Sequence, residues 1–316
     1  MNTNDTILGA IEPDVAERIA QAGDEIAQGR TTSSKLMSGL AMASVPIALA
    51  ALSRDAFGQA NVPTSVIGVL DFALALEIFE NEFYKAVLGT SSSAAQNAAF
   101  ATVRAKVPAA AVASIQQIQK HEAAHVAFLS SQPGVTNAFN LTADSFDFTG
   151  ARGAGNGPFA TATTDLNFLL LTAQGAEDTG VRAYKGQAPV IMATGDTATL
   201  EYALRIHSVE ARHASKIRRL RRQNGATTVK FSGTITGASA GAENISNPPA
   251  AAVTALAAIY NGEDNTSQGG ITVTGLSNLP SSNFIAANAA TEAFDEPLTR
   301  AAVVAIVQPF FIPTIS

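Results

Sequence analysis

The sequence predicts a mainly α-helical protein built around a four-helix bundle with one long crossover. Two Glu-x-x-His tetrads lie within long apolar helical segments, Glu122-Ala-Ala-His125 and Glu210-Ala-Arg-His213. Glu77 and Glu177 interrupt two further segments of the same kind. Between the second and third segments, residues 131–164 are rich in Gly, Thr, Asn and Pro without a regular period. A bundle of this type has one connection that travels its whole length, so this loop is expected.

Turn and cap residues delimit the expected helices. The first is opened by Pro63-Thr64-Ser65 and closed by Gly89, and the second has its main portion after Pro108 and ends near Ser131. The predicted ranges are 64–88, 108–131, 165–187 and 197–223. Four arginines at 218, 219, 221 and 222 end the last helix. Cations there complement the helix dipole, and a contact with an anionic surface is the alternative.

The pattern changes on both sides of the bundle. We expect an N-terminal extension at 1–60, the bundle at 61–225, and a C-terminal region at 226–316 that packs on the bundle or on neighbouring molecules. In the last region, alternation predicts short strands at 229–232 and 271–274, and apolar runs predict helices at 249–260 and 297–308.

Residues 36–52 carry no charge, and three interpretations of this run stay open. It is a retained apolar helix, an export signal cleaved near Ala60, or a membrane anchor that touches a membrane or cell surface. The acidic residues before it make a poor signal n-region. Its length is at the lower limit for a membrane span.

Composition excludes other classes of protein. The net charge of -6 and the aromatic content of 6% give no reason to expect a nucleic-acid partner. The absence of cysteine excludes disulfides, thiolate metal sites and cysteine nucleophiles. It does not locate the protein, because a cysteine-free chain suits either redox compartment.

The spacing of the glutamates and histidines predicts a site for two metal ions. Residues three apart on a helix lie about 60° apart around its axis, so each tetrad brings a carboxylate and an imidazole to one point. Four buried carboxylates are costly unless they are compensated, and two divalent cations balance their charge. Oxygen and imidazole ligands favour iron or manganese. The expected ligands are Glu77, Glu122, His125, Glu177, Glu210 and His213.

Other polar residues on these helices are candidates for supporting roles. Tyr84 and Tyr184 each follow a candidate ligand by seven residues, so both can point back and bond ligand carboxylates, or simply pack in the core. His207 is a candidate to support the ligands or to join them, or else a core histidine. Glu80 can approach the edge of the site, whereas Glu82 is expected in solvent. His121 is expected to face away from the side of the helix that carries Glu122.

These motifs together resemble the ferritin-like family that includes the plant desiccation-related proteins and their bacterial relatives. The resemblance rests on Leu74-Ala-Leu-Glu77-Ile-Phe-Glu-Asn-Glu-Phe-Tyr84, on the two tetrads, on Ala176-Glu-Asp-Thr-Gly-Val-Arg-Ala-Tyr-Lys-Gly186 and on Ala293-Phe-Asp-Glu-Pro-Leu298. It implies the same six ligands. Bacterial relatives are often exported, but no Arg-Arg pair precedes the apolar run, so periplasmic, secreted, cell-surface and cytoplasmic locations all stay open.

Two functions fit these features. The first is a di-iron or di-manganese protein that reacts with dioxygen or peroxide, as a ferroxidase or a peroxide-removing oxidoreductase linked to stress protection. The second is a structural or desiccation-protective protein that uses the bundle as a scaffold, with a structural or vestigial metal site. In either case we expect a homo-oligomer or a larger assembly.

Overall fold

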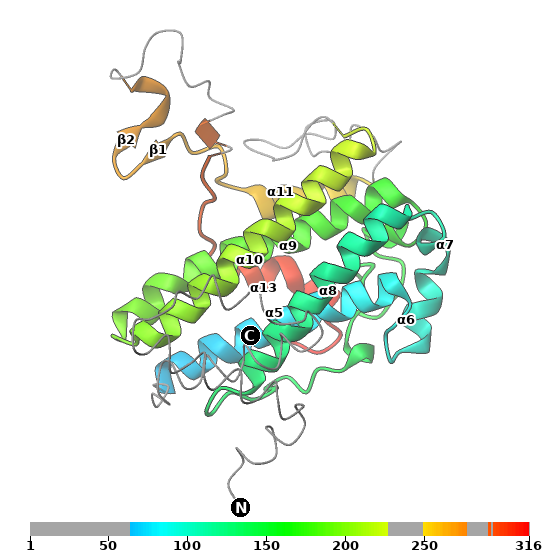
Figure 1. Cartoon of the computed structure of the whole chain (residues 1–316), viewed down its shortest axis with the longest axis horizontal. Helices are drawn as coiled ribbons and strands as arrows, with labels where there is room; N and C mark the ends of the chain where they lie inside the picture. Colours follow the sequence, from blue (N-terminus) through cyan, green and yellow to red (C-terminus); the bar gives the residue numbers. More distant parts are fainter. Residues whose placement is uncertain (1–63, 227–248, 277–289, 292, 316) are drawn as a thin grey trace, which may run out of the picture. The chain divides into compact units, whose positions relative to one another are not determined.

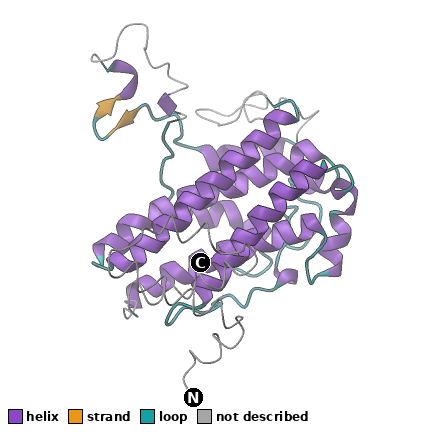
Figure 2. Cartoon of the chain, in the orientation of Figure 1, coloured by secondary structure: helices purple, strands orange, loops and turns teal. Residues whose placement is uncertain are grey.

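The computed structural model describes residues 64–226, 249–276, 290–291 and 293–315. Four long helices lie side by side (Figure 1), and Figure 2 shows that helices make up most of the described chain. They are α5 (Thr64–Leu88), α8 (Ala109–Ser130), α9 (Leu166–Ala193) and α10 (Thr197–Gln223). The closest packing pairs α5 with α8 and α9 with α10. The predicted mainly α fold with a four-helix bundle is confirmed.

Local signals fix the ends of these helices. Gly89 (φ 78°) and Gly195 (φ 77°) follow the ends of α5 and α9 in the left-handed region, where only glycine is free of strain. At the start of α9 the side chain of Asp165 accepts a hydrogen bond from the Phe168 amide, at 2.8 Å. Asp196 does the same for the Thr199 amide at the start of α10, at 2.9 Å. These carboxylates satisfy amides that the first helical turn leaves unpaired.

Several predicted boundaries were wrong. Helix α9 continues past residue 187 and through Pro189, which removes one backbone hydrogen bond without ending the helix. Two short helices, α6 (Ala94–Ala99) and α7 (Ala101–Arg104), precede α8. The predicted strand at 271–274 is shorter, because β2 (Ile271–Thr272) pairs with β1 (Ser267–Gln268) and the chain then enters a 3₁₀ turn, η3 (Val273–Gly275). The predictions for 36–52 and 229–232 lie outside the described residues.

The crossover packs against the C-terminal tail. It contains the 3₁₀ turns η1 (Ala143–Ser145) and η2 (Ala160–Thr163), and Phe146 forms an isolated antiparallel bridge with Phe311. The Asp147 amide donates to the carbonyl of Phe310 at 2.8 Å. Phe79 of α5 packs against the rings of Phe146, Phe310 and Phe311, with centroids at 5.8, 5.6 and 5.5 Å. The tail therefore closes the core beside α5.

Two later helices and some of the described residues between them are attached to α9. They are α11 (Ala250–Tyr260) and α13 (Arg300–Val307), which leads into the 3₁₀ turn η5 (Gln308–Phe310). The buried guanidinium of Arg182 donates to the carbonyls of Ile259, of Asn261 at 2.8 Å and of Glu296 at 2.7 Å. It also pairs with the buried Glu263 carboxylate at 3.1 Å. One side chain of α9 thus holds both parts of the C-terminal region.

A search of the helices for membrane-crossing segments gives a negative result for the described part of the chain. Each of these helices is too short or too polar for that role.

Gly186 tests how closely the tail must approach α9. A methyl group at Gly186 would overlap the Leu298 carbonyl, which is backbone and cannot turn aside. We expect Gly186→Ala to lower the free energy of unfolding by about 1–3 kcal/mol, as overpacking does. Denaturant unfolding measures the effect. The matched control is Gly68→Ala, where the new methyl group meets only the Arg300 side chain at 3.9 Å. Equal stability of the two variants would contradict the close approach.

Candidate metal centre

All four long helices contribute to one buried polar cluster. Helix α5 supplies Glu77, α8 supplies Glu122 and His125, α9 supplies Glu177, and α10 supplies Glu210 and His213. The four glutamates are 0% exposed, and the two histidines are also buried. The structure therefore brings together all six residues that the sequence pattern selects, from positions up to 136 residues apart (213 - 77).

The cluster divides into two overlapping groups of potential ligands. One contains Glu77, Glu122, His125 and Glu210, and the other contains Glu122, Glu177, Glu210 and His213. In each group, one ligand atom per residue lies within 4.8 Å of the corresponding atoms of the others. Glu122 and Glu210 belong to both groups, so each can offer one carboxylate oxygen to either side. Each of the two overlapping groups could therefore offer four ligands to a metal ion.

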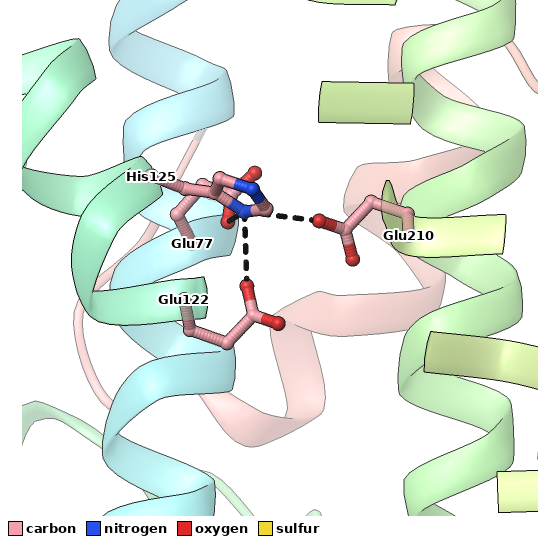
Figure 3. Close-up of side chains that lie close together, drawn as sticks. All are labelled: Glu77, Glu122, His125 and Glu210. Atoms are coloured by element: carbon pink, nitrogen blue, oxygen red, sulfur yellow. Dashed lines mark hydrogen bonds and ion pairs between the residues drawn. The ribbon is translucent and has the colours of Figure 1, made fainter. Parts of the chain in front are cut away.

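The first group surrounds one nitrogen of His125. Its Nδ1 atom lies 3.0 Å from Oε2 of Glu77, 3.3 Å from Oε2 of Glu122 and 3.1 Å from Oε1 of Glu210. Figure 3 shows the imidazole between these three carboxylates, which reach it from α5, α8 and α10. Three oxygens and a nitrogen from three helices therefore point into one small volume.

The second group surrounds His213 in the same way. Its Nδ1 atom lies 2.7 Å from Oε1 of Glu122, 3.4 Å from Oε2 of Glu177 and 3.5 Å from Oε2 of Glu210. The two imidazole rings lie 6.2 Å apart between their centroids. Each histidine thus has one terminal carboxylate of its own, Glu77 or Glu177, and both shared ones.

Several of these buried atoms are close to each other without being hydrogen-bonded. Five such atoms have no hydrogen-bond partner among the described residues. These atoms are Oε1 of Glu122, Oε2 of Glu177, both carboxylate oxygens of Glu210 and Nδ1 of His213. Buried polar atoms are normally paired, because an unpaired one costs about 1–3 kcal/mol. Atoms that converge on a point without aligning on each other fit a central cation. The donor set, carboxylate oxygens and imidazole nitrogens, suits iron or manganese.

Protonation shows how strongly the cluster attracts positive charge. Burial alone would lower the pKa of His213, but the carboxylates of Glu177, Glu122 and Glu210 outweigh it and raise that pKa to about 12. The pKa of His125 is raised for the same reason, chiefly by Glu77. Burial and the neighbouring Glu210 carboxylate raise the pKa of Glu122 well above its ordinary value. Protons thus compensate the carboxylates, and divalent cations must compete with them.

Each of the two tyrosines bonds the terminal carboxylate of the opposite helix. The Tyr184 hydroxyl of α9 donates to Oε1 of Glu77 on α5, at 2.5 Å, and the Tyr84 hydroxyl of α5 donates to Oε1 of Glu177 on α9. Burial and the adjoining carboxylate raise the pKa of each tyrosine well above its ordinary value, so both remain donors. The repeated Glu-x6-Tyr element of α5 and α9 thus forms a reciprocal pair.

A fifth carboxylate lies at the edge of the cluster. Glu80 is 3% exposed, and burial followed by the charges of Glu210 and Glu177 raises its pKa well above the ordinary value. Its Oε1 atom lies 3.2 Å from the place that a side chain at Gly180 would occupy. The prediction that Glu82 is solvated was wrong, because it is buried and pairs with Lys85 at 2.7 Å.

Of the two histidines outside the tetrads, one does not lie where the sequence placed it. The prediction that His121 faces away was wrong, since its Nδ1 atom is 2.9 Å from Nε2 of His213 and their rings stack at 5.1 Å. Burial and the neighbouring His213 lower the pKa of His121 to about 4, so it is neutral. His207 lies apart from both groups, with Nδ1 at 3.1 Å from the Val181 carbonyl.

The fold and the cluster together define the class of carboxylate-rich four-helix bundles. A family model described as a ferritin-like domain matches residues 65–223, about half of the chain. The chain belongs to the ferritin-like domain family, as its motifs predicted. The closer relationship to the desiccation-related proteins stays a prediction. No curated protein and no solved structure gives a significant match.

The tyrosines can be tested by removing one oxygen atom each. We expect Tyr84→Phe and Tyr184→Phe to weaken metal binding about 10-fold or more, because groups that orient metal ligands contribute on that scale. Competition titration with a chelator measures the change. The matched control is Tyr202→Phe, whose hydroxyl bonds Thr199 at 3.1 Å on α10. Unchanged affinity in the first two variants would show that the hydroxyls only fill space.

His121 provides a separate test of the His213 group. A metal on Nδ1 of His213 leaves a proton on Nε2, and neutral His121 is placed to accept it. We expect His121→Ala to weaken one of two metal-binding steps about 10-fold or more. His207→Ala should change neither step, since its ring bonds a backbone carbonyl. If both variants behave alike in the same titration, the contact with His213 has no role in binding.

Proposed function

We propose that the protein binds two iron or manganese ions and uses them in an oxidoreductase reaction with dioxygen or peroxide. Glu77 and His125 would hold one ion, Glu177 and His213 would hold the other, and Glu122 and Glu210 would be available to both. The observation that carries this proposal is the sharing of two carboxylates by two ligand groups. A single structural ion would need only one of the groups.

The chemistry of the bound metal explains why two ions are useful. Two bound ferrous ions would supply two electrons, which with two protons would reduce dioxygen to hydrogen peroxide, or hydrogen peroxide to two molecules of water. The protein residues hold and orient the ligands through Tyr84 and Tyr184, and they exclude bulk water from a cluster whose carboxylates are fully buried. Removal of ferrous iron or of peroxide is a form of stress protection, and we extend the proposal to that role.

The alternative is a scaffold with a structural metal site. Arg182 ties α11 and the tail to the bundle through three backbone carbonyls, which is a rigid arrangement of the kind an assembly subunit needs. In that case the metal stabilises the bundle without changing oxidation state. A homo-oligomer or larger assembly is part of this proposal and agrees equally well with the redox function.

Metal content and reactivity separate these functions. We expect the full-length protein to take up about two ferrous ions per chain without oxygen, the content typical of such bundles. His125→Ala and His213→Ala should each lower the content by about one ion, whereas His207→Ala should not. Elemental analysis measures content, and near-ultraviolet absorbance then follows ferric iron after dioxygen or peroxide is added.

Each possible result has one meaning. Two ions with oxidation by either oxidant support the redox proposal. Two ions that stay ferrous support a structural metal. A content near zero in protein whose circular dichroism remains helical would show that the cluster does not serve as a metal site.

A further inference from the structure

An apolar cavity of about 30 Å³ lies beside the acidic cluster. Its wall comes from α5, the crossover, α9, α11 and the chain around α13, and includes the rings of Phe79 and Phe83. Eleven of the thirteen wall residues are buried, and Ala176 and Ile306 are half-buried. A single water needs about 10–15 Å³ by the same measure, so the cavity has room for a molecule of a few atoms.

The chemistry of the wall disfavours water. Only two wall residues carry a polar side chain, Thr172 and Thr179, and their hydroxyls already donate to backbone carbonyls of α9, at 2.9 and 2.7 Å. A buried water typically requires two to four hydrogen bonds to polar groups, and apolar cavities of this kind stay dry or take apolar molecules. The size and lining of the cavity therefore select a small apolar guest.

The cavity and the cluster are lined by neighbouring residues of α5 and α9. On α9, the wall residue Ala176 directly precedes Glu177, and the wall residue Thr179 follows Glu177 by two positions. On α5, the ring of Phe83 packs edge-on against Tyr84 at 5.2 Å, and the Tyr84 hydroxyl bonds Glu177. A molecule in the cavity thus contacts Phe83, the ring that packs against Tyr84, and Tyr84 in turn bonds Glu177.

We propose that this cavity binds dioxygen and holds it next to the metal centre. The proposal rests on the proposed function for its role, but the binding of a small apolar molecule stands on the cavity alone. Dioxygen is apolar and diatomic, and it is the oxidant that gains most from an apolar site. Hydrogen peroxide forms several hydrogen bonds and has no partner for them in this wall.

Gly175 offers a way to fill the cavity with one methyl group. A methyl group there would lie 3.1 Å from Cδ1 of Ile259 and 3.6 Å from Cδ2 of Leu256, both of which line the cavity. The methyl group and the flexible end of Ile259 both face the cavity, so the added methyl group reduces its volume. Because alanine also favours the helix over glycine, Gly175→Ala is expected to fold. Gly68→Ala makes the same change on α5 away from the cavity.

The first experiment tests binding without any metal chemistry. Crystals of the full-length protein are pressurised with xenon, and the anomalous signal locates it. We expect one xenon atom bounded by Phe83, Gly175 and Ile259. Its occupancy should fall to about one-third or less in Gly175→Ala, since the added methyl takes up most of the volume, and it should be unchanged in Gly68→Ala. An absence of xenon from the wild-type cavity would overturn the proposal.

The second experiment tests the role in delivery. Stopped-flow mixing of ferrous-loaded protein gives a second-order rate constant for each oxidant. We expect Gly175→Ala to react about 10-fold more slowly with dioxygen, a change of about 1.4 kcal/mol, and at the wild-type rate with peroxide. Equal rates for dioxygen, or equal slowing with both oxidants, would overturn delivery. If the wild-type protein reacts with neither oxidant, the proposed function fails, and the xenon result still decides whether the cavity binds apolar guests.

Discussion

The structure depends on how the negative charge of five carboxylates is balanced, because the four long helices bury all five in one cluster. Glu77, Glu122, Glu177 and Glu210 have no exposure, and Glu80 is nearly as buried. A buried ionised carboxylate without a partner costs several kcal/mol. Replacing one charged partner in this cluster by an apolar residue would therefore destabilise the bundle. The two imidazoles and bound cations or protons must balance it. Gly180 is part of the same constraint, since a Cβ there would lie 3.2 Å from Oε1 of Glu80, closer than an ordinary contact.

Helix α9 carries buried charge on two sides, and this places it between the centre and the C-terminal region. Glu177 faces the cluster, while the next residue, Asp178, accepts hydrogen bonds from Tyr260 of α11 at 2.6 Å and from Arg218 of α10. Arg221 of α10 is 1% exposed and donates to Gln174 at 2.5 Å. This second polar network holds α9 in a fixed rotation. Because Glu177 and Tyr184 lie on the same helix, the network also fixes their direction toward the cluster.

The sequence predicted those features that depend on spacing along one helix, and it missed those that depend on a partner across an interface. The tetrads and caps determined the bundle and the six converging residues. His121 was misplaced because it was compared with Glu122 alone; it shares a side with His125, four residues on, and meets His213 across the interface. Arg221 was expected only to complement the dipole at the end of α10. It is instead buried against Gln174 and the rest of the network, and nothing in the local pattern of α10 shows that partner.

The apolar and the acidic halves of the bundle interior reinforce each other. The phenylalanines around Phe79 and Phe83 keep water from the side of the cluster where Tyr84 bonds Glu177. In such surroundings a hydrogen bond to a charged group is stronger than in water, while a lost bond is more costly. The aromatic packing therefore makes the orientation of Glu177 firm. The same packing leaves an apolar space that water does not readily enter, so a dry boundary for the centre and a site for a small apolar molecule follow from one arrangement of side chains.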